Sequence, residues 1–463
     1  MRTKITGSVI AGIFFVSSAS ILGLGAGGGV AGASNPPCSP KNIRSKTTIT
    51  FWESASSGTN EKELLALVKA FNASHPNVVV RDVNQPGGNE QTYDDFLTSL
   101  GNHTSPQVFF TDMYTNQGLA DSRGVLPVAT CVKGTGYKTS IFAKKAILQQ
   151  TIGGKLIGLP YSASAPVLYY NKQAFAKAKI KTAPTTFAQM ASDAAALKKA
   201  GYKDGMALKN DPWWLQIWSG MANLDFVNYN NGRTHRTTAV AFNNSTSRTL
   251  LTDLQNMVKN RTAKAFPATG TGLSAYDNLL DMATLKAGMS IDTSAALGEI
   301  AAYLPLYKGV TLGVAPLPKL VAAADKYGVQ PGGNALYITS TDNAAQTAAA
   351  WEFVQYLDGA NNLAAWDNAT GYVPITTTAA STATIKNLWS KKPYYKTAYT
   401  EILTGTATNA SSGPAVGDYY GVTSAVGNAL ATLLNNTGSK PTTQLNNAAS
   451  SANKVIKEYN SSL

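Results

Sequence analysis

The stretch that decides the fold is KLIGLPYSASAPVLYYNKQAF, residues 155–175. It reads as a strand that reaches Pro160, then a run of small hydroxylated residues, then a second strand over 167–170 and a helix from about Lys172. An extended, proline-punctuated segment lined by small polar side chains is what a crossing between two lobes requires. A ligand could lie against these small polar side chains.

Strands and helices alternate on the N-terminal side of this stretch. Residues 47–52, 77–83 and 107–112 have β-type composition, and the segments TNEKELLALVKAFNASHP and YDDFLTSL between them have helical spacing. This alternation predicts a parallel sheet with helices on both faces. Because ligands bind beyond the carboxyl ends of strands in such sheets, we look for the site at Trp52, Glu53 and Ser54 after the first strand and at Asp112, Met113 and Tyr114 after the third.

The C-terminal side continues the mixture of helix and strand. A capping box of Thr186 and Gln189 predicts a helix that runs to about Lys199. A second lobe extends from there to about residue 320, a strand resumes at 335–338, and a helix follows it. The tail from about residue 381 is rich in Ala, Thr, Ser and Asn, and its helices are poorly defined by pattern. A chain of 463 residues is long enough for two lobes, each with its own core.

The N-terminus and the cysteines indicate export. Residues 1–33 have two basic residues, an apolar stretch and an A-x-A ending, which is typical of a signal peptide, with an uncleaved anchor as the alternative. Cys38 follows two prolines, so a lipoprotein is not expected. An extracellular or cell-envelope location favours a disulfide between Cys38 and Cys131 over two free thiols. Three scattered histidines supply no ligand spacing, so we expect no metal and no cofactor.

The charge pattern limits the classes of partner. The net charge is +13, yet only 14% of residues are charged and no run of Lys and Arg exceeds a pair. A nucleic-acid surface needs clustered basic residues, so we expect no nucleic-acid partner. No G-x-S-x-G motif and no P-loop occur. A secreted glycan hydrolase is kept as an alternative function.

Two further stretches could contact a ligand. The segment NDPWWLQIW places Trp213 beside Trp214, and aromatic faces stack on sugars. The alternative is that Trp214 and Trp218, four residues apart, belong to a helix core. In the segment PGGN, Gly332, Gly333 and Asn334 would let a ligand approach the backbone closely; a plain hairpin turn is the alternative.

Seven segments together resemble one family. They are ITFWES, YDDFLTSL, LPYSASAPVLYYNKQAFAKAKI, PTTFAQM, GGNALYI, AAWEFVQYL and WDNATGYVPIT. In this order they resemble extracellular solute-binding proteins of ABC transporters, and most of all the subgroup that binds glycerol 3-phosphate or sugars. The resemblance implies a non-enzymatic, monomeric binder that delivers a small polar ligand to the permease subunits of its transporter.

The resemblance also implies the fold. It is an α/β, two-lobed, periplasmic-binding-protein-like fold of type II, with a mainly parallel sheet flanked by helices in each lobe and hinge strands between them. The implied lobes are residues 34–160 with 330–375, and 161–329 with 376–463. The YSAS segment would then lie at the crossing between the lobes and contribute Ser162 or Ser164 to the wall of the ligand site.

By motif, the resemblance carries ligand contacts onto residues of this chain. They are Glu53, Ser54, Asp94, Tyr114, Trp214, Thr293, Ser294, Gly333 and Tyr372. Two positions depart from the pattern of glycerol-phosphate binders, because Asp211 replaces a tryptophan and Thr423 replaces the arginine that pairs with phosphate. A phosphate without a cation would be poorly compensated. We therefore expect a neutral sugar or oligosaccharide, with glycerol 3-phosphate or a glycerophosphodiester as the alternative and an adhesion protein as a third hypothesis.

Overall fold

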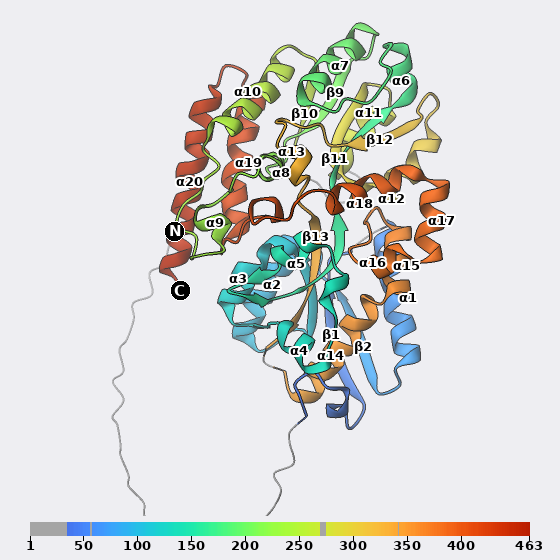
Figure 1. Ribbon diagram of the computed structural model, residues 1–463, viewed down its shortest axis with the longest axis vertical. Helices are drawn as coiled ribbons and strands as arrows, with labels where there is room; N and C mark the ends of the chain where they lie inside the picture. Colours follow the sequence, from blue (N-terminus) through green and yellow to red (C-terminus); the bar gives the residue numbers. More distant parts are fainter. Residues whose placement is uncertain (1–34, 56–57, 269–274, 341) are drawn as a thin grey trace, which may run out of the picture. The chain divides into compact units, whose positions relative to one another are not determined.

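Two β-sheets organise the protein (Figure 1). The computed structural model describes residues 35–463 except 56–57, 269–274 and 341. The expected signal peptide, residues 1–33, lies outside the described residues. By their contacts, residues 36–463 form one compact unit, and everything below concerns that unit.

The first sheet has six strands in the order β2-β1-β3-β13-β4, with β7 also paired to β13. Their bounds are β1 Thr47–Glu53, β2 Val78–Asn84, β3 Val108–Asp112, β4 Val125–Leu126, β7 Leu159–Ser164 and β13 Gly332–Thr339. Strand β1 is parallel to β2 and β3. Strand β13 is antiparallel to β3, β4 and β7. One half of this sheet is therefore parallel and the other half antiparallel.

The second sheet has five strands in the order β10-β9-β11-β8-β12. Their bounds are β8 Pro166–Asn171, β9 Asp204–Lys209, β10 Ala263–Phe266, β11 Ala287–Thr293 and β12 Leu312–Pro316. Strand β9 is parallel to β10 and β11, whereas β8 is antiparallel to β11 and β12. The protein thus has the expected two-lobed α/β architecture, but each sheet is mixed. A short hairpin of β5 (Thr151–Ile152) and β6 (Lys155–Leu156) stands apart.

Helices surround both sheets (Figure 1). Those before the second sheet are α1 Gly58–Ser74, α2 Gly88–Asn102, α3 Asn116–Ser122, α4 Ala129–Thr135 and α5 Lys144–Gln149. Those between and around its strands are α6 Lys172–Lys177, α7 Phe187–Lys199, α8 Trp213–Met221, α9 Asn228–Gly232, α10 Ser245–Lys259, α11 Asp277–Ala283, α12 Leu297–Tyr303 and α13 Ala324–Tyr327. After β13 come α14 Ala344–Leu357, α15 Ala360–Ala369, α16 Thr377–Ala380, α17 Ala383–Lys391, α18 Lys396–Leu403, α19 Tyr419–Asn435 and α20 Pro441–Ser461.

The helices form where the sequence pattern places an apolar stripe. On α1, Leu64 and Phe71 face the core, and the ring of Phe71 meets Phe353 of α14 edge-on at 5.0 Å. The predicted capping box is present at the start of α7, where Thr186 and Gln189 bond each other's backbone N–H. In the tail, α19 and α20 pack on each other and beside α10.

The chain crosses from the first sheet to the second at Ala165. This single residue separates β7 from β8, so the stretch quoted at the outset forms a strand in each sheet. The chain returns after α13 and enters β13 at Gly332. The expected lobe boundary, between residues 160 and 161, falls inside β7. Residues of β7 on both sides of this boundary pair with β13.

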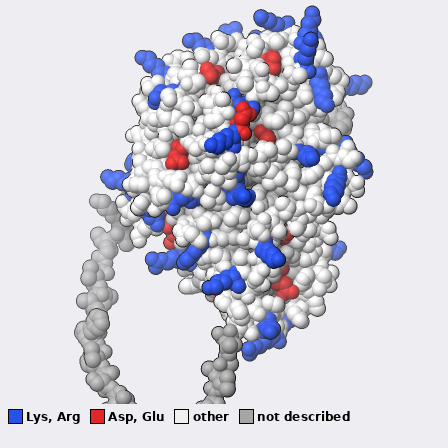
Figure 2. Space-filling view, viewed as in Figure 1, with Lys and Arg blue, Asp and Glu red and all other residues white. Residues whose placement is uncertain are grey.

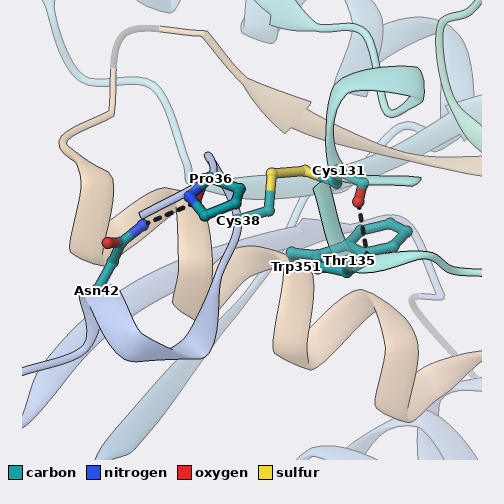
Figure 3. Close-up of a disulfide and its surroundings, with 6 residues drawn as sticks. All are labelled: Pro36, Cys38, Asn42, Cys131, Thr135 and Trp351. Carbon is teal, nitrogen blue, oxygen red and sulfur yellow. Dashed lines mark hydrogen bonds between the residues drawn. A yellow bond between two sulfur atoms is a disulfide. The ribbon is translucent and has the colours of Figure 1, made fainter. Parts of the chain in front are cut away.

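A disulfide joins Cys38 to Cys131 and confirms the expected pairing (Figure 3). The Cα atoms are 5.2 Å apart and 93 positions separate them in the sequence. Thr135 Oγ1 donates to the Cys131 carbonyl at 2.7 Å, and Trp351 Nε1 donates to Thr135 Oγ1 at 3.2 Å. The disulfide therefore ties the N-terminal segment to α4, and the hydrogen bond from Trp351 ties α4 to α14.

Two carboxyl groups are buried where α14 ends and in α15. Asp358 is 3% exposed; it accepts a hydrogen bond from the Tyr137 hydroxyl, and its Oδ1 has no partner among the described residues. Asp367 is fully buried, and neither carboxyl oxygen has a hydrogen-bond partner there. Burial raises the pKa of Asp358 to about 8, and burial followed by the charge of Asp358 raises the pKa of Asp367. Both carboxyl groups are therefore more easily protonated in the folded protein than in the unfolded chain.

This burial predicts that the protein is more stable at pH 5 than at pH 7.5. A carboxyl whose folded pKa lies above its unfolded pKa binds more protons when folded, so stability falls as pH rises between those two values. Each pKa unit corresponds to about 1.4 kcal/mol. We expect Asp358→Asn to raise the melting temperature at pH 7.5 and to change it little at pH 5, because the amide can still accept from Tyr137. An equal effect of the substitution at both pH values would contradict this account.

Candidate functional site

The carboxyl end of β1 carries a buried acid. Glu53 is 2% exposed; its Oε1 accepts from Asn84 Nδ2 at 2.8 Å, and its Oε2 accepts from the Ala55 N–H. Burial raises the pKa of Glu53, and these two hydrogen bonds partly oppose the shift. The next residue, Ser54, donates through Oγ to Asn89 Oδ1 at 2.8 Å. Glu53 and Ser54 are thus held by partners at the start of α2 and the end of β2.

A row of polar residues crosses three adjacent strands of the first sheet. Asn334 of β13 lies opposite Asp112 of β3 on one side and opposite Ser162 of β7 on the other. Asn334 Oδ1 accepts from Asn89 Nδ2 at 3.0 Å. The Ser162 Oγ is buried and has no hydrogen-bond partner in the part of the chain that the structure describes. Residues directly opposite one another share a face of the sheet, so the row presents three polar groups together.

The glycines of β13 bring the crossing strands close. Gly333 has φ +110°, and a Cβ built there would lie 1.9 Å from the Ser162 carbonyl oxygen. Gly332 lies opposite Ser164, and a Cβ there would lie 2.6 Å from Cζ2 of Trp213. Only glycine fits either position without movement of its neighbours.

Each sheet contributes one turn at the end of a strand to the site. In each turn, which we call a corner, an aspartate carboxylate accepts from the N–H of an aromatic residue two positions later. After β3, Asp112 Oδ1 accepts from the Tyr114 N–H at 3.0 Å. Shortly after β9, Asp211 Oδ1 accepts from the Trp213 N–H at 2.9 Å. The two aromatic side chains then meet, because Trp213 Nε1 donates to the Tyr114 hydroxyl at 3.3 Å. This hydrogen bond links the two sheets directly.

A buried polar network lies behind these aromatic rings. The Tyr114 hydroxyl donates to the Pro331 carbonyl at 2.9 Å, and its ring stacks on Tyr419 with centroids 5.1 Å apart. Tyr419 donates to Gln216 Oε1 at 3.1 Å, and Gln216 Nε2 donates to Gln330 Oε1 at 3.0 Å. The sequence analysis missed Tyr419, Gln216 and Gln330, because no local pattern marks residues that meet from separate segments.

The second sheet supplies an ion pair, and the two adjacent tryptophans follow its strand β9. Lys209 Nζ lies 3.2 Å from Asp292 Oδ2, which also accepts from Asn278 Nδ2 at 3.0 Å. Trp214 is 1% exposed and donates to the Lys209 carbonyl at 2.8 Å, so its indole lies in the core. Trp213, by contrast, is only partly buried.

The other predicted contacts are spread unevenly. Thr293 is partly buried and its carbonyl accepts from the Tyr169 hydroxyl at 2.7 Å, while the buried Ser294 Oγ accepts from the Ala165 N–H at 3.2 Å. Tyr372 is partly buried and stacks on Trp366 at 5.7 Å. Asp94 is exposed on α2, apart from this group of buried side chains.

The two positions that differ from glycerol-phosphate binders are both described. Asp211 lies in the corner with Trp213. Burial raises the pKa of Asp211, and the charge of Lys209 partly opposes this shift. Thr423 is buried in α19, where its hydroxyl donates to the Tyr419 carbonyl at 3.0 Å. Neither position supplies a positive charge.

The electrostatics of the site are dominated by carboxylates. Burial, and then the charge of Asp211, raises the pKa of Asp112 to about 7. Among the described charges that shift the pKa of Glu53, Asp112, Asp211 and Glu299, the single cation is Lys209, and Asp292 already pairs with it. On the face shown in Figure 2, Lys and Arg side chains are scattered and do not form one patch.

Comparison with known proteins adds to this geometry. Residues 55–362 match the family of bacterial extracellular solute-binding proteins. The chain belongs to this family.

Relatives of this solute-binding protein lie in the expected subgroup. The sn-glycerol-3-phosphate-binding periplasmic protein UgpB of Pectobacterium atrosepticum is 27% identical over 427 residues, which is 90% of this chain and 93% of the relative. UgpB of Escherichia coli K12 is also 27% identical, over 78% of this chain and 82% of its own length.

Solved structures share the fold of this solute-binding protein. UgpB of Mycobacterium tuberculosis, solved with glycerophosphocholine, has a TM-score of 0.74 at 17% identity, covering 89% of this chain and 99% of that chain. The GacH receptor of Streptomyces glaucescens, solved unliganded and with acarbose, has a TM-score of 0.72 at 19% identity, covering 89% and 98%. No helix in the described ranges combines the length and the apolar character that spanning a membrane requires.

Proposed function

We propose that this solute-binding protein captures a sugar or oligosaccharide and delivers it to the permease subunits of an ABC importer. The observation that carries the proposal is the paired corner of Asp112 with Tyr114 and Asp211 with Trp213, one corner from each sheet. Carboxylates accept hydrogen bonds from vicinal hydroxyls, and aromatic faces cover the apolar faces of sugar rings. A ligand held by both corners would favour the closed arrangement of the lobes, which the permease would recognise.

The absence of a free cation at the described site supports a sugar over a phosphate ester. Lys209 is engaged by Asp292, and Thr423 is neutral. A phosphate in this setting would lack the charge-assisted contacts that carry most of its recognition. Glycerol 3-phosphate or a glycerophosphodiester is the second candidate, because the curated relatives above are named for glycerol 3-phosphate.

The proposal extends to the other parts of the chain. Residues 1–33 act as a signal peptide, and the protein works as an extracellular or cell-envelope monomer without catalytic activity. The lobes comprise 34–160 with 330–375, and 161–329 with 376–463, and they rotate about the crossings next to Ala165 and Gly332. At the site, Trp213 takes the stacking role, together with Tyr372, while Trp214 supports it from the core.

A thermal-shift screen tests the proposal. The protein that begins at Ser34 is melted with mono- and oligosaccharides, polyols, glycerol 3-phosphate and glycerophosphocholine. A ligand at 100 times its dissociation constant should stabilise the protein by about 2.7 kcal/mol. A shift with saccharides is the expected result. Shifts with phosphate esters alone would replace the sugar by the second candidate, and a flat response to every compound would reject the binding function.

The variant Trp213→Ala provides a sharper test of the site. Loss of a central aromatic contact typically costs about 2 kcal/mol, so we expect the dissociation constant of the ligand to rise roughly 30-fold. The matched control is Trp389→Ala on α17, where a partly buried indole packs on Tyr399 at 4.7 Å. Calorimetry should show a loss of affinity in the first variant and not in the second. Similar affinities in both variants would remove Trp213 from the site.

A further inference from the structure

Each aspartate of the paired corners has one carboxylate oxygen without a hydrogen bond to any described residue. Oδ1 of Asp112 and Oδ1 of Asp211 are used by the N–H groups of their own turns. Within the described residues, the Oδ2 atoms make no hydrogen bond to the protein, and both residues are partly buried. Two partly desolvated carboxylates therefore remain available to a ligand from opposite sheets.

Several tyrosine side chains lie near enough to Asp112 for its charge to act on them. Tyr114 follows it in the chain, and Trp213 meets Tyr114 at 3.3 Å. Burial, and then the negative charge of Asp112, raises the pKa of Tyr372, Tyr419 and Tyr420. The charge of Asp112 therefore acts on all three side chains. A carboxylate near aromatic side chains favours a cation, because the face of an aromatic ring attracts positive charge.

No unpaired cation is found near these carboxyl groups in the described part of the chain. Lys209 is the only described positive charge that acts on these carboxylates, and its ammonium group is 3.2 Å from Asp292. Glu299, whose pKa burial raises, adds further negative charge near Tyr372. Buried charges are normally paired or neutralised, so a ligand that closes this site must either bring a positive charge or leave these carboxyl groups to take up protons.

The row beside Asp112 supplies groups for the uncharged part of a ligand. Asp112, Asn334 and Ser162 lie in register on β3, β13 and β7. The Ser162 hydroxyl is fully buried and lacks a hydrogen-bond partner in the described residues. A buried hydroxyl without a partner is costly, and a ligand hydroxyl at this row would satisfy it.

We propose that the natural ligand is a hydroxylated molecule with a cationic nitrogen, held between Asp112 and Asp211, such as an amino sugar. This inference rests on the proposed function and narrows its ligand class. The same chemistry occurs in an amino-saccharide and in a glycerol derivative with a quaternary ammonium group. A neutral sugar bound only through its hydroxyls is the competing account, and it predicts no preference for a charged nitrogen.

Calorimetry with matched ligands tests the inference. A glucosamine oligosaccharide, its N-acetylated counterpart, a neutral oligosaccharide of equal length and glycerophosphocholine are titrated below the pKa of the amino group. A charge-assisted contact in a desolvated site should make the free amine bind at least about tenfold more tightly than its N-acetylated counterpart. Asp112→Asn and Asp211→Asn should each reduce this ratio to about threefold or less. The amide keeps an oxygen for the N–H group of the turn, and melting temperatures verify that both variants fold.

The control and the outcomes separate this inference from the proposed function. Asp253→Asn, on α10 and outside the proposed site, should leave the ratio unchanged. Equal affinity for the amine and its N-acetylated counterpart would overturn the cationic ligand and leave the sugar-binding function standing. Binding of glycerophosphocholine alone, lost in Asp112→Asn, would support the cationic nitrogen and overturn the saccharide. Failure of all four ligands to bind would overturn both proposals.

Discussion

Replacement of both Cys38 and Cys131 by serine is expected to lower the free energy of unfolding by about 4 to 5 kcal/mol. The disulfide closes a loop of 93 positions, and on the chain-entropy model its loss frees the unfolded chain to that extent. With an unfolding entropy of about 2.1 cal/mol/K per residue, a protein of this length should melt roughly 5 °C lower. Calorimetric melting of the two proteins measures the difference.

A reductant provides the control for this prediction. Wild-type protein with a reduced disulfide should melt close to the double-serine variant, and the reductant should leave that variant unchanged. The surrounding contacts remain in both cases, because Thr135 bonds the Cys131 backbone and not its sulfur (Figure 3). A wild-type protein that melts unchanged after its thiols are shown to be free would contradict the entropic account.

Gly333→Ala is expected to have the other large effect, on both stability and ligand binding. The methyl group would approach the Ser162 carbonyl oxygen to 1.9 Å, and the backbone there has φ +110°. Neither a backbone oxygen nor a strand in a ladder can yield as a flexible side chain does, so β7 and β13 must separate. We expect a loss of more than about 3 kcal/mol in stability. Ligand binding should become undetectable, because Ser162 and Asn334 flank this contact.

Gly136→Ala is the matched control for backbone strain. Gly136 also has a positive φ, +70°, but a Cβ there meets nothing within 4 Å. Its substitution should cost about 1 kcal/mol and leave ligand affinity unchanged. If both alanine variants lose the same stability and keep the ligand, the close contact at Gly333 does not control the crossing.

Local sequence signals predicted much of the fold. The capping box at Thr186, the apolar stripe of α1 and the crossing around Ala165 follow from residues close together in the chain. The mixed character of the sheets did not follow from them. Strand β13 enters the first sheet from residue 332, between β3 and β4, and no local pattern shows which strand a distant segment will join.

The sequence indicated the candidate residues at the ends of strands but not the buried polar residues behind them. Glu53 and Tyr114 follow strands, so the general rule for sheets located them. The sequence does not show which of the adjacent Trp213 and Trp214 would face a ligand. The carbonyl of Lys209 accepts from the indole of Trp214 and holds that ring in the core. Gln216 and Gln330 meet from segments more than 100 residues apart, and two glutamines carry no signal of such a contact.

The hydrogen bond between Trp213 and Tyr114 gives the protein a built-in optical reporter. Its donor belongs to the corner of one sheet and its acceptor to the corner of the other. A hinge rotation that parts the corners must break the bond and expose the indole to water, which shifts tryptophan emission to longer wavelength. Opening and closing can therefore be followed in unlabelled protein, in real time, with Trp213→Phe measuring the emission of the other six tryptophans.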